Sequence, residues 1–159
     1  MKIVKVNENE IEKLYEVYET HTETIEEEDQ YKELIIRNIP KLINGSRETF
    51  ALVEGDEYIA ECSLGLKYDE PDFTIENRRA CLSFMIVRKD HINKGLGRRM
   101  LEYVFSYLKE KDYSEISLEV NLDNQSALHL YEKCGFNKVI REIIDGNEKS
   151  VVLLKDLSV

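Results

Sequence analysis

The second half of the chain runs from a buried strand through a glycine turn into an amphipathic helix, and then into another strand. Residues 81–87 are almost wholly apolar, which predicts a buried strand. Gly95 and Gly97 open a helix over 95–111, and residues 114–121 form the next apolar run. Two strands joined through a helix in this way pack as a right-handed parallel crossover. This segment therefore predicts an α/β fold.

Hairpin signals on both sides of that segment make the expected sheet a mixed one. The apolar spacing predicts the order β-α-α-β-β-β-α-β-α-β-β, a mixed central sheet flanked by helices. The expected strands are residues 2–6, 49–54, 57–66, 80–88, 114–121, 136–144 and 149–157. The expected helices are residues 7–20, a second helix marked by apolar residues over 31–42 and closed by Asn44-Gly45, and residues 95–111 and 124–134. The acidic stretch 21–29 is expected to be a loop or a frayed helix start.

Composition narrows the class of protein. The 159 residues favour one domain, residues 1–159. No apolar run approaches the roughly 20 residues of a membrane helix, and the first residues lack a signal-peptide pattern, so we expect a cytoplasmic protein with no membrane partner. A net charge of −10 argues against a nucleic-acid partner. The cysteines and histidines are scattered, so we expect no structural metal.

The glycine turn before the helix has the chemistry of a phosphate site. Such a turn exposes backbone N–H groups, and a helix N-terminus adds partial positive charge, which suits a pyrophosphate. Lys94, Arg98 and Arg99 offer cationic contacts. A Gly-x-Gly before a helix is also frequent as turn chemistry alone, and the third glycine of a dinucleotide fingerprint is missing. The turn by itself leaves both interpretations open.

The helix expected over 124–134 carries a second motif. Asn124, Ala127 and Tyr131 share one of its faces, because steps of three and four residues complete about two turns. A polar amide and a phenol hydroxyl then point the same way. The alternatives are that Tyr131 is a core residue with its hydroxyl at the surface and that Asn124 only caps the helix.

Taken together, the two motifs resemble the GNAT superfamily of acetyl-CoA-dependent N-acetyltransferases. The resemblance lies in the order strand, glycine turn, helix, strand, followed by Asn-x-x-Ala-x-x-Leu-Tyr-x-x-x-Gly-Phe, and it is sharpest over residues 80–136. Residues 1–79 match only in the pattern of elements. The resemblance implies one N-acetyltransferase domain that uses acetyl-CoA as co-substrate.

The resemblance also implies roles for individual residues. Asn124 matches a CoA-contacting asparagine, and Tyr131 matches the usual general acid. The residues matching the pantetheine-binding strand are Met85, Ile86 and Val87, and those matching the pyrophosphate loop are Asn93, Lys94, Gly95, Leu96, Gly97 and Arg98. The chain departs from the family where Lys89 stands in place of Pro, Ile92 in place of Gln or Arg, and Asn93 in place of Gly.

Amine acetylation needs a proton removed from the amine and an acid for the departing thiolate. Tyr131 fits the acid. Glu119 is the candidate base, because it stands in an otherwise apolar strand and matches a glutamate of GNAT enzymes resembling the ribosomal-protein alanine acetyltransferases. The alternatives are a solvent-facing or ion-paired Glu119, a role for Glu61, and a water chain without a single base.

Acidic and aromatic residues gather in two regions where the family places its acceptor site. One is the acidic stretch 21–29. The other is the loop 67–79, with Tyr68, Asp69, Glu70, Asp72 and Phe73. The combination suits a cationic amine, although a solvated acidic surface explains the same residues. We expect a small-molecule primary amine as acceptor; the alternatives are a protein or peptide N-terminus, or a non-catalytic CoA-binding sensor. A homodimer using the C-terminal hairpin is also possible within this family.

Overall fold

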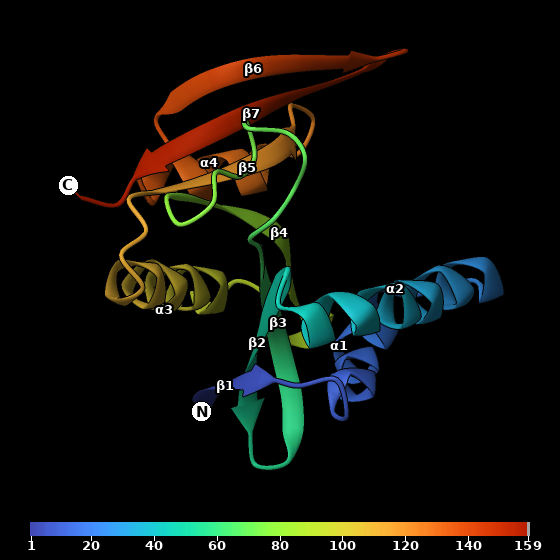
Figure 1. The fold of residues 1–159 in the computed structure, drawn as a ribbon. Helices are drawn as coiled ribbons and strands as arrows, with labels where there is room; N and C mark the ends of the chain where they lie inside the picture. Colours follow the sequence, from blue (N-terminus) through green and yellow to red (C-terminus); the bar gives the residue numbers. More distant parts are fainter. Residues whose placement is uncertain (159) are drawn as a thin grey trace. The chain divides into compact units, whose positions relative to one another are not determined.

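The computed structural model describes residues 1–158, and its strands form one mixed sheet. Within those residues seven strands follow the order β1-β2-β3-β4-β5-β7-β6. Strand β4 pairs with β5 in parallel, whereas β1–β2, β5–β7 and β6–β7 are antiparallel. The strands (Figure 1) are β1 Lys2–Val6, β2 Arg47–Glu54, β3 Glu57–Gly65, β4 Arg79–Val87, β5 Glu115–Asn121, β6 Lys138–Asp145 and β7 Glu148–Asp156. The expected α/β class, the order of elements and the parallel pair are confirmed.

The helices of the described chain are α1 Tyr15–Tyr18, α2 Ile25–Asn44, α3 Leu96–Glu110 and α4 Gln125–Lys133, with short 3₁₀ turns at Ile11–Leu14, Glu19–His21 and Lys89–His91. The chain divides into two compact units. The first unit is Met1–Leu64 with Phe84–Met100, and the second is Gly65–Ser83 with Leu101–Val159. Strand β4 and helix α3 therefore supply residues to both units.

The first helical region differs from the expected continuous helix over 7–20. It is α1 between two 3₁₀ turns. The Thr20 hydroxyl donates to the Val17 carbonyl at 2.7 Å, and the Thr22 hydroxyl donates to the Glu19 carbonyl at 2.8 Å. Side-chain bonds of this kind compete with helical hydrogen bonds, which explains why the segment stays short and irregular.

Helix α2 begins within the acidic stretch 21–29, which is therefore a helix start and not wholly a loop. Thr24 is its N-cap and accepts from the Glu27 N–H at 3.1 Å. The acidic residues that follow lie in the first turn, where they complement the positive end of the helix dipole. Gly45 ends the helix with φ 78°, a left-handed conformation that glycine adopts without strain. Ile35 is buried in the core of the first unit.

The second unit is built around β5 and the hairpin β6–β7. Strand β5 starts parallel to β4 and runs antiparallel to β7 over its whole length. Phe136 is fully buried, with its ring centroid 5.8 Å from those of Phe105 and Tyr131. The end of α4 brings Phe136 there, because Gly135 takes φ 99° and the Phe136 N–H donates to the Tyr131 carbonyl at 3.0 Å.

Candidate active site

The turn after β4 has the backbone shape expected of an anion loop. Asn93 and Gly95 both have positive φ, at 63° and 75°. Asparagine is one of the few residues besides glycine that tolerates this left-handed region. Asn93 therefore gives the turn access to this left-handed conformation.

Helix α3 starts directly after this turn. Its first regular hydrogen bond joins the Arg99 N–H to the Gly95 carbonyl at 3.1 Å. A helix leaves its first N–H groups without an intrahelical acceptor. Lys94 and Arg98 are exposed beside them, Leu96 is buried, and Gly97 is half-buried in the first turn. Backbone donors, a helix dipole and two cations are a donor set that fits the diphosphate of acetyl-CoA.

Two hydrogen bonds join the end of β4 to the 3₁₀ turn Glu19–His21, and no sequence pattern predicts them. Nε2 of His21 donates to the Val87 carbonyl at 2.7 Å, and the Lys89 N–H donates to the Thr20 hydroxyl at 3.0 Å. Met85, Ile86 and Val87 are half-buried. His21 and Thr20 thus fix the strand segment that was matched to pantetheine binding.

Asp90 organises the start of the same turn. Its carboxylate accepts from Arg88 Nε at 3.1 Å and from His91 Nδ1 at 2.9 Å. The hydrogen bond from Arg88 is the main reason that the pKa of Asp90 falls to about 2. His91 is therefore held by a carboxylate in the loop.

Glu61, the reserve candidate for the base, is enclosed in a polar cluster of the first unit. It is fully buried, accepts hydrogen bonds from the hydroxyls of Tyr18 and Ser63, and forms an ion pair with Arg47 at 3.2 Å. Burial and the neighbouring carboxylate raise the pKa of Tyr18 far above its usual value. A carboxylate so fully engaged holds β2, β3 and α1 together.

The second unit contains a cavity of about 600 Å³. Its lining includes Glu119, whose side chain is exposed while its neighbours Leu118 and Val120 are buried. The exposure of Glu119 agrees with the solvent-facing alternative, and the alternation along β5 turns its carboxylate into the cavity. The full lining is Tyr68, Asp69, Glu70, Phe73, Cys81, Leu82, Ser83, Glu119, Asn121 and Ser150.

One wall of this cavity is the loop 66–78, which is anchored at several points. The Ser117 hydroxyl donates to the Phe73 carbonyl at 2.6 Å. Arg79 donates to the carbonyls of Pro71 and Asp72 at 3.0 and 3.1 Å. Tyr68 lies so close to Gly65 that an added Cβ would stand 2.5 Å from the ring. The loop is therefore a shaped wall, and Gly65 is needed for its close approach.

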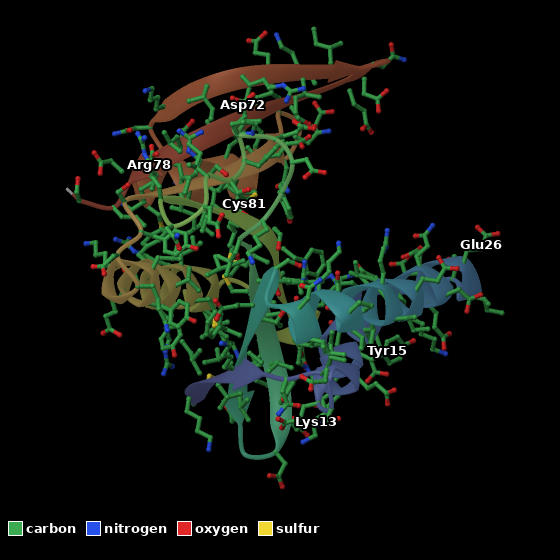
Figure 2. The ribbon with its side chains drawn as sticks, viewed as in Figure 1. Lys13, Tyr15, Glu26, Asp72, Arg78 and Cys81 are labelled. Atoms are coloured by element: carbon green, nitrogen blue, oxygen red, sulfur yellow. The ribbon has the colours of Figure 1, made fainter. Side chains whose placement is uncertain are left out.

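Charge in the cavity is unevenly neutralised. Arg141 on β6 pairs with Glu70 at 2.7 Å and lies 3.6 Å from Asp72, and Figure 2 labels Asp72. Asp69 and Glu119 have no ion-pair partner within residues 1–158. Their carboxylates share the cavity with the rings of Tyr68 and Phe73, whose centroids are 6.4 Å apart. Two carboxylates and two aromatic faces suit a cation.

Helix α4 presents the second motif. Asn124 Oδ1 accepts from the Ala127 N–H at 3.2 Å, so the residue does cap the helix. Its Nδ2 makes no hydrogen bond to the described part of the chain. Tyr131 is half-buried with its ring against Phe136, and it is not part of the cavity lining that contains Glu119.

Cys81 also lines the cavity. It is buried, and burial raises the pKa of its thiol to about 11. A thiol that stays protonated near neutral pH is a poor nucleophile. Cys81 therefore contributes packing rather than covalent chemistry, as expected from the sequence.

Within residues 1–158, no helix is both long and apolar enough to cross a membrane. No group of three or more His, Cys, Asp or Glu side chains in the same residues has the arrangement of a metal site.

The fold and the two motifs define an acetyltransferase, and comparison with known proteins agrees. The family model described as "Acetyltransferase (GNAT) family" matches residues 9–136. The chain belongs to this family and is an N-acetyltransferase, an acyltransferase enzyme.

Individual relatives differ in their acceptors. The [ribosomal protein bS18]-alanine N-acetyltransferase of Escherichia coli (strain K12) is 31% identical over 121 residues, which cover 71% of this chain and 81% of that protein. The crystal structure of the ribosomal-protein-S18-alanine N-acetyltransferase from Escherichia coli matches with a TM-score of 0.75 at 21% identity, covering 99% of this chain and 94% of that one. An aminoglycoside 6'-N-acetyltransferase complexed with coenzyme A matches with a TM-score of 0.71 at 14% identity, covering 99% and 97%.

Proposed function

We propose that this protein transfers the acetyl group of acetyl-CoA to a primary amine of a cationic small molecule, and that residues 1–159 act as one cytoplasmic acetyltransferase domain. The observation that carries the choice of acceptor is the cavity of the second unit. There Asp69 and Glu119 form no salt bridge within residues 1–158, although the Glu119 charge acts on Arg141, and both carboxylates lie in a lining with two aromatic rings. A cationic amine supplies the missing charge.

Acetyl-CoA supplies an acyl group already activated as a thioester. In this proposal the backbone of Met85, Ile86 and Val87 lies along its pantetheine. Asn124 contributes through its side-chain Nδ2, which the helix cap does not use. The residues proposed to hold its phosphates are Asn93, Lys94, Gly95, Leu96, Gly97 and Arg98, whose backbone N–H groups and cations form the donor set described above.

Proton transfer is assigned to two residues. An alkylamine has a pKa near 10.4, so it arrives as an ammonium and must lose a proton before it attacks. The Glu119 carboxylate accepts that proton, directly or through one water in the cavity. The Tyr131 hydroxyl, whose class has a reference pKa near 10, donates a proton to the departing thiolate.

A second candidate acceptor is the N-terminal amine of a protein. The observation in its favour is the 31% identity to the bS18-alanine N-acetyltransferase of E. coli. A peptide N-terminus is also a primary amine, but its reference pKa is near 7.7–8.0. A larger fraction of it is therefore unprotonated at neutral pH, and its attack depends less on a general base.

An acceptor comparison separates the two. Thiol release from acetyl-CoA is measured with a diamine, with a monoamine of the same length, and with a peptide that begins with alanine. We expect the diamine to have the highest kcat/KM, and Asp69→Asn to remove its advantage over the monoamine. A peptide preferred over both amines would overturn the small-molecule assignment and leave the acetyltransferase standing.

A further inference from the structure

The outer edge of strand β4 loses its partner strand before the strand ends. Within residues 1–158, β5 pairs with β4 only from Arg79 to Cys81. Directly after β4, the Arg88 N–H donates to the Ile59 carbonyl of β3 at 2.8 Å. Successive residues of a strand turn their N–H and C=O groups to alternate edges. The N–H and C=O groups of Val87 therefore point to the edge opposite β3.

His21 forms a hydrogen bond at this edge. Its Nε2 lies 2.7 Å from the carbonyl oxygen of Val87, and its ring is half-buried. Since a carbonyl only accepts, Nε2 carries the proton and donates it. A partly buried carbonyl at the end of a strand costs free energy when no donor meets it. His21 therefore supplies the donor that a neighbouring strand would otherwise give to Val87.

Thr20 adds a second hydrogen bond to the same end of β4. Its hydroxyl accepts from the Lys89 N–H at 3.0 Å and donates to the Val17 carbonyl at 2.7 Å. Val17 is fully buried in the core of the first unit. The Lys89 ammonium also lies 3.9 Å from the Glu23 carboxylate. The backbone on both sides of Arg88 is thus held by a segment that is anchored in the core.

We propose that His21 is a positioning residue for acetyl-CoA, which acts through Val87 to hold the end of β4 in the conformation that binds pantetheine. The inference rests on the proposed assignment of pantetheine to the backbone of residues 85–87. An edge that is already ordered binds an amide-containing chain without paying for its own ordering. When the donor is lost, the fraction of molecules with a binding-competent edge falls, and the apparent dissociation constant rises by the same factor.

Two substitutions of His21 test this role by isothermal titration calorimetry with acetyl-CoA. His21→Leu removes the donor and should raise the dissociation constant about tenfold. His21→Gln keeps an N–H donor and should stay within about threefold of the wild type. Thr22→Val is the matched control, because the Thr22 hydroxyl bonds the Glu19 carbonyl of the same turn at 2.8 Å. It should bind as the wild type does, and circular dichroism checks that each variant is folded.

Two further readouts separate positioning from a general loss of structure. In His21→Leu, the KM for acetyl-CoA should rise while kcat at saturating acetyl-CoA stays near the wild-type value, because His21 touches no reacting atom. Without cofactor, the amides of Arg88 and Lys89 should exchange several-fold faster in His21→Leu than in Thr22→Val.

The outcomes distinguish this inference from the proposed function. A wild type that binds acetyl-CoA, with His21→Leu binding within about twofold of it, overturns the role of His21 alone. Equal losses of affinity in His21→Leu and His21→Gln overturn the role of the donor, and so does a fall in kcat with an unchanged KM. A folded wild type that binds no acetyl-CoA overturns the cofactor assignment, and this inference with it.

Discussion

Asp90 is the residue whose charge the loop before α3 depends on most. Hydrogen bonds from Arg88 and His91 stabilise its ionised form, and its pKa falls to about 2. A carboxyl whose pKa is lowered by folding stabilises the native state at pH values above its unfolded pKa, about 3.9. That contribution is lost as the pH falls through the folded value. The loop should therefore keep its contacts until the pH falls between about 4 and 2.

An NMR titration of the Asp90 carboxyl carbon measures this directly. We expect a midpoint near 2 in the wild type. Arg88→Met removes the largest cause and should move the midpoint upward, toward about 3.9. A wild-type midpoint already near that value would show that the carboxylate is not held as described.

The sequence predicted which residues belong to the candidate site better than it predicted their exposure and their hydrogen-bond partners. Asn124 was expected either to cap the helix or to contact CoA, and the structure shows the cap. Glu119 was placed in an apolar strand, yet its side chain is exposed. The partners of Glu61 could not be found, because Tyr18 is 43 residues away in sequence and no local pattern connects them. His21 was missed for the same reason.

Among the elements, the turn after β4 depends on a left-handed residue at position 93. Asn93→Gly preserves access to φ 63°, whereas Asn93→Val places a β-branched side chain in a region that costs about 1–2 kcal/mol. We expect the glycine variant to bind acetyl-CoA within about threefold of the wild type and the valine variant to bind about tenfold more weakly. Isothermal titration calorimetry measures both, and equal affinities would remove this turn from the cofactor site.

The loop 66–78 is a second element with a testable anchor. Arg141 holds it through Glu70 and Asp72, and exposed pairs of this kind add little to stability because solvent screens them. Arg141→Ala should therefore speed amide hydrogen exchange in the loop a few-fold, and high salt should do the same to the wild type. Lys149→Ala is the matched control, because its pair with Glu142 is equally exposed and lies outside the cavity. Unchanged exchange in Arg141→Ala would show that other contacts suffice.

Element boundaries were predictable where local chemistry marked them. Gly45 ends α2, and the Asn124 cap starts α4, as the sequence indicated. For the acidic stretch 21–29 the sequence left two alternatives, a loop or a frayed helix start, and the structure has a helix start there. Thr24 and the helix dipole make those residues a favourable first turn.

At the scale of the whole molecule, the sequence predicted the order of the elements along the chain, and two motifs predicted the family. The acceptor did not, because the cavity is assembled from loop 66–78, β4, β5 and β7, which are distant in the chain. The sequence also could not predict which carboxylates of the cavity are ion-paired. Arg141 pairs with Glu70 but not with Asp69, and only the folded structure shows this.

The central claim is that the cavity containing Glu119 is the acceptor site of an acetyltransferase, with Glu119 as its base. The most direct test is the kcat of Glu119→Gln beside that of Glu142→Gln, an exposed glutamate on β6 outside the cavity. Thiol release is followed with saturating acetyl-CoA and a cationic amine. We expect kcat to fall at least about a hundredfold in Glu119→Gln and to stay near the wild-type value in Glu142→Gln. Full activity in Glu119→Gln would contradict the assignment of the base, and no thiol release by the wild type with any cationic amine would contradict the acceptor.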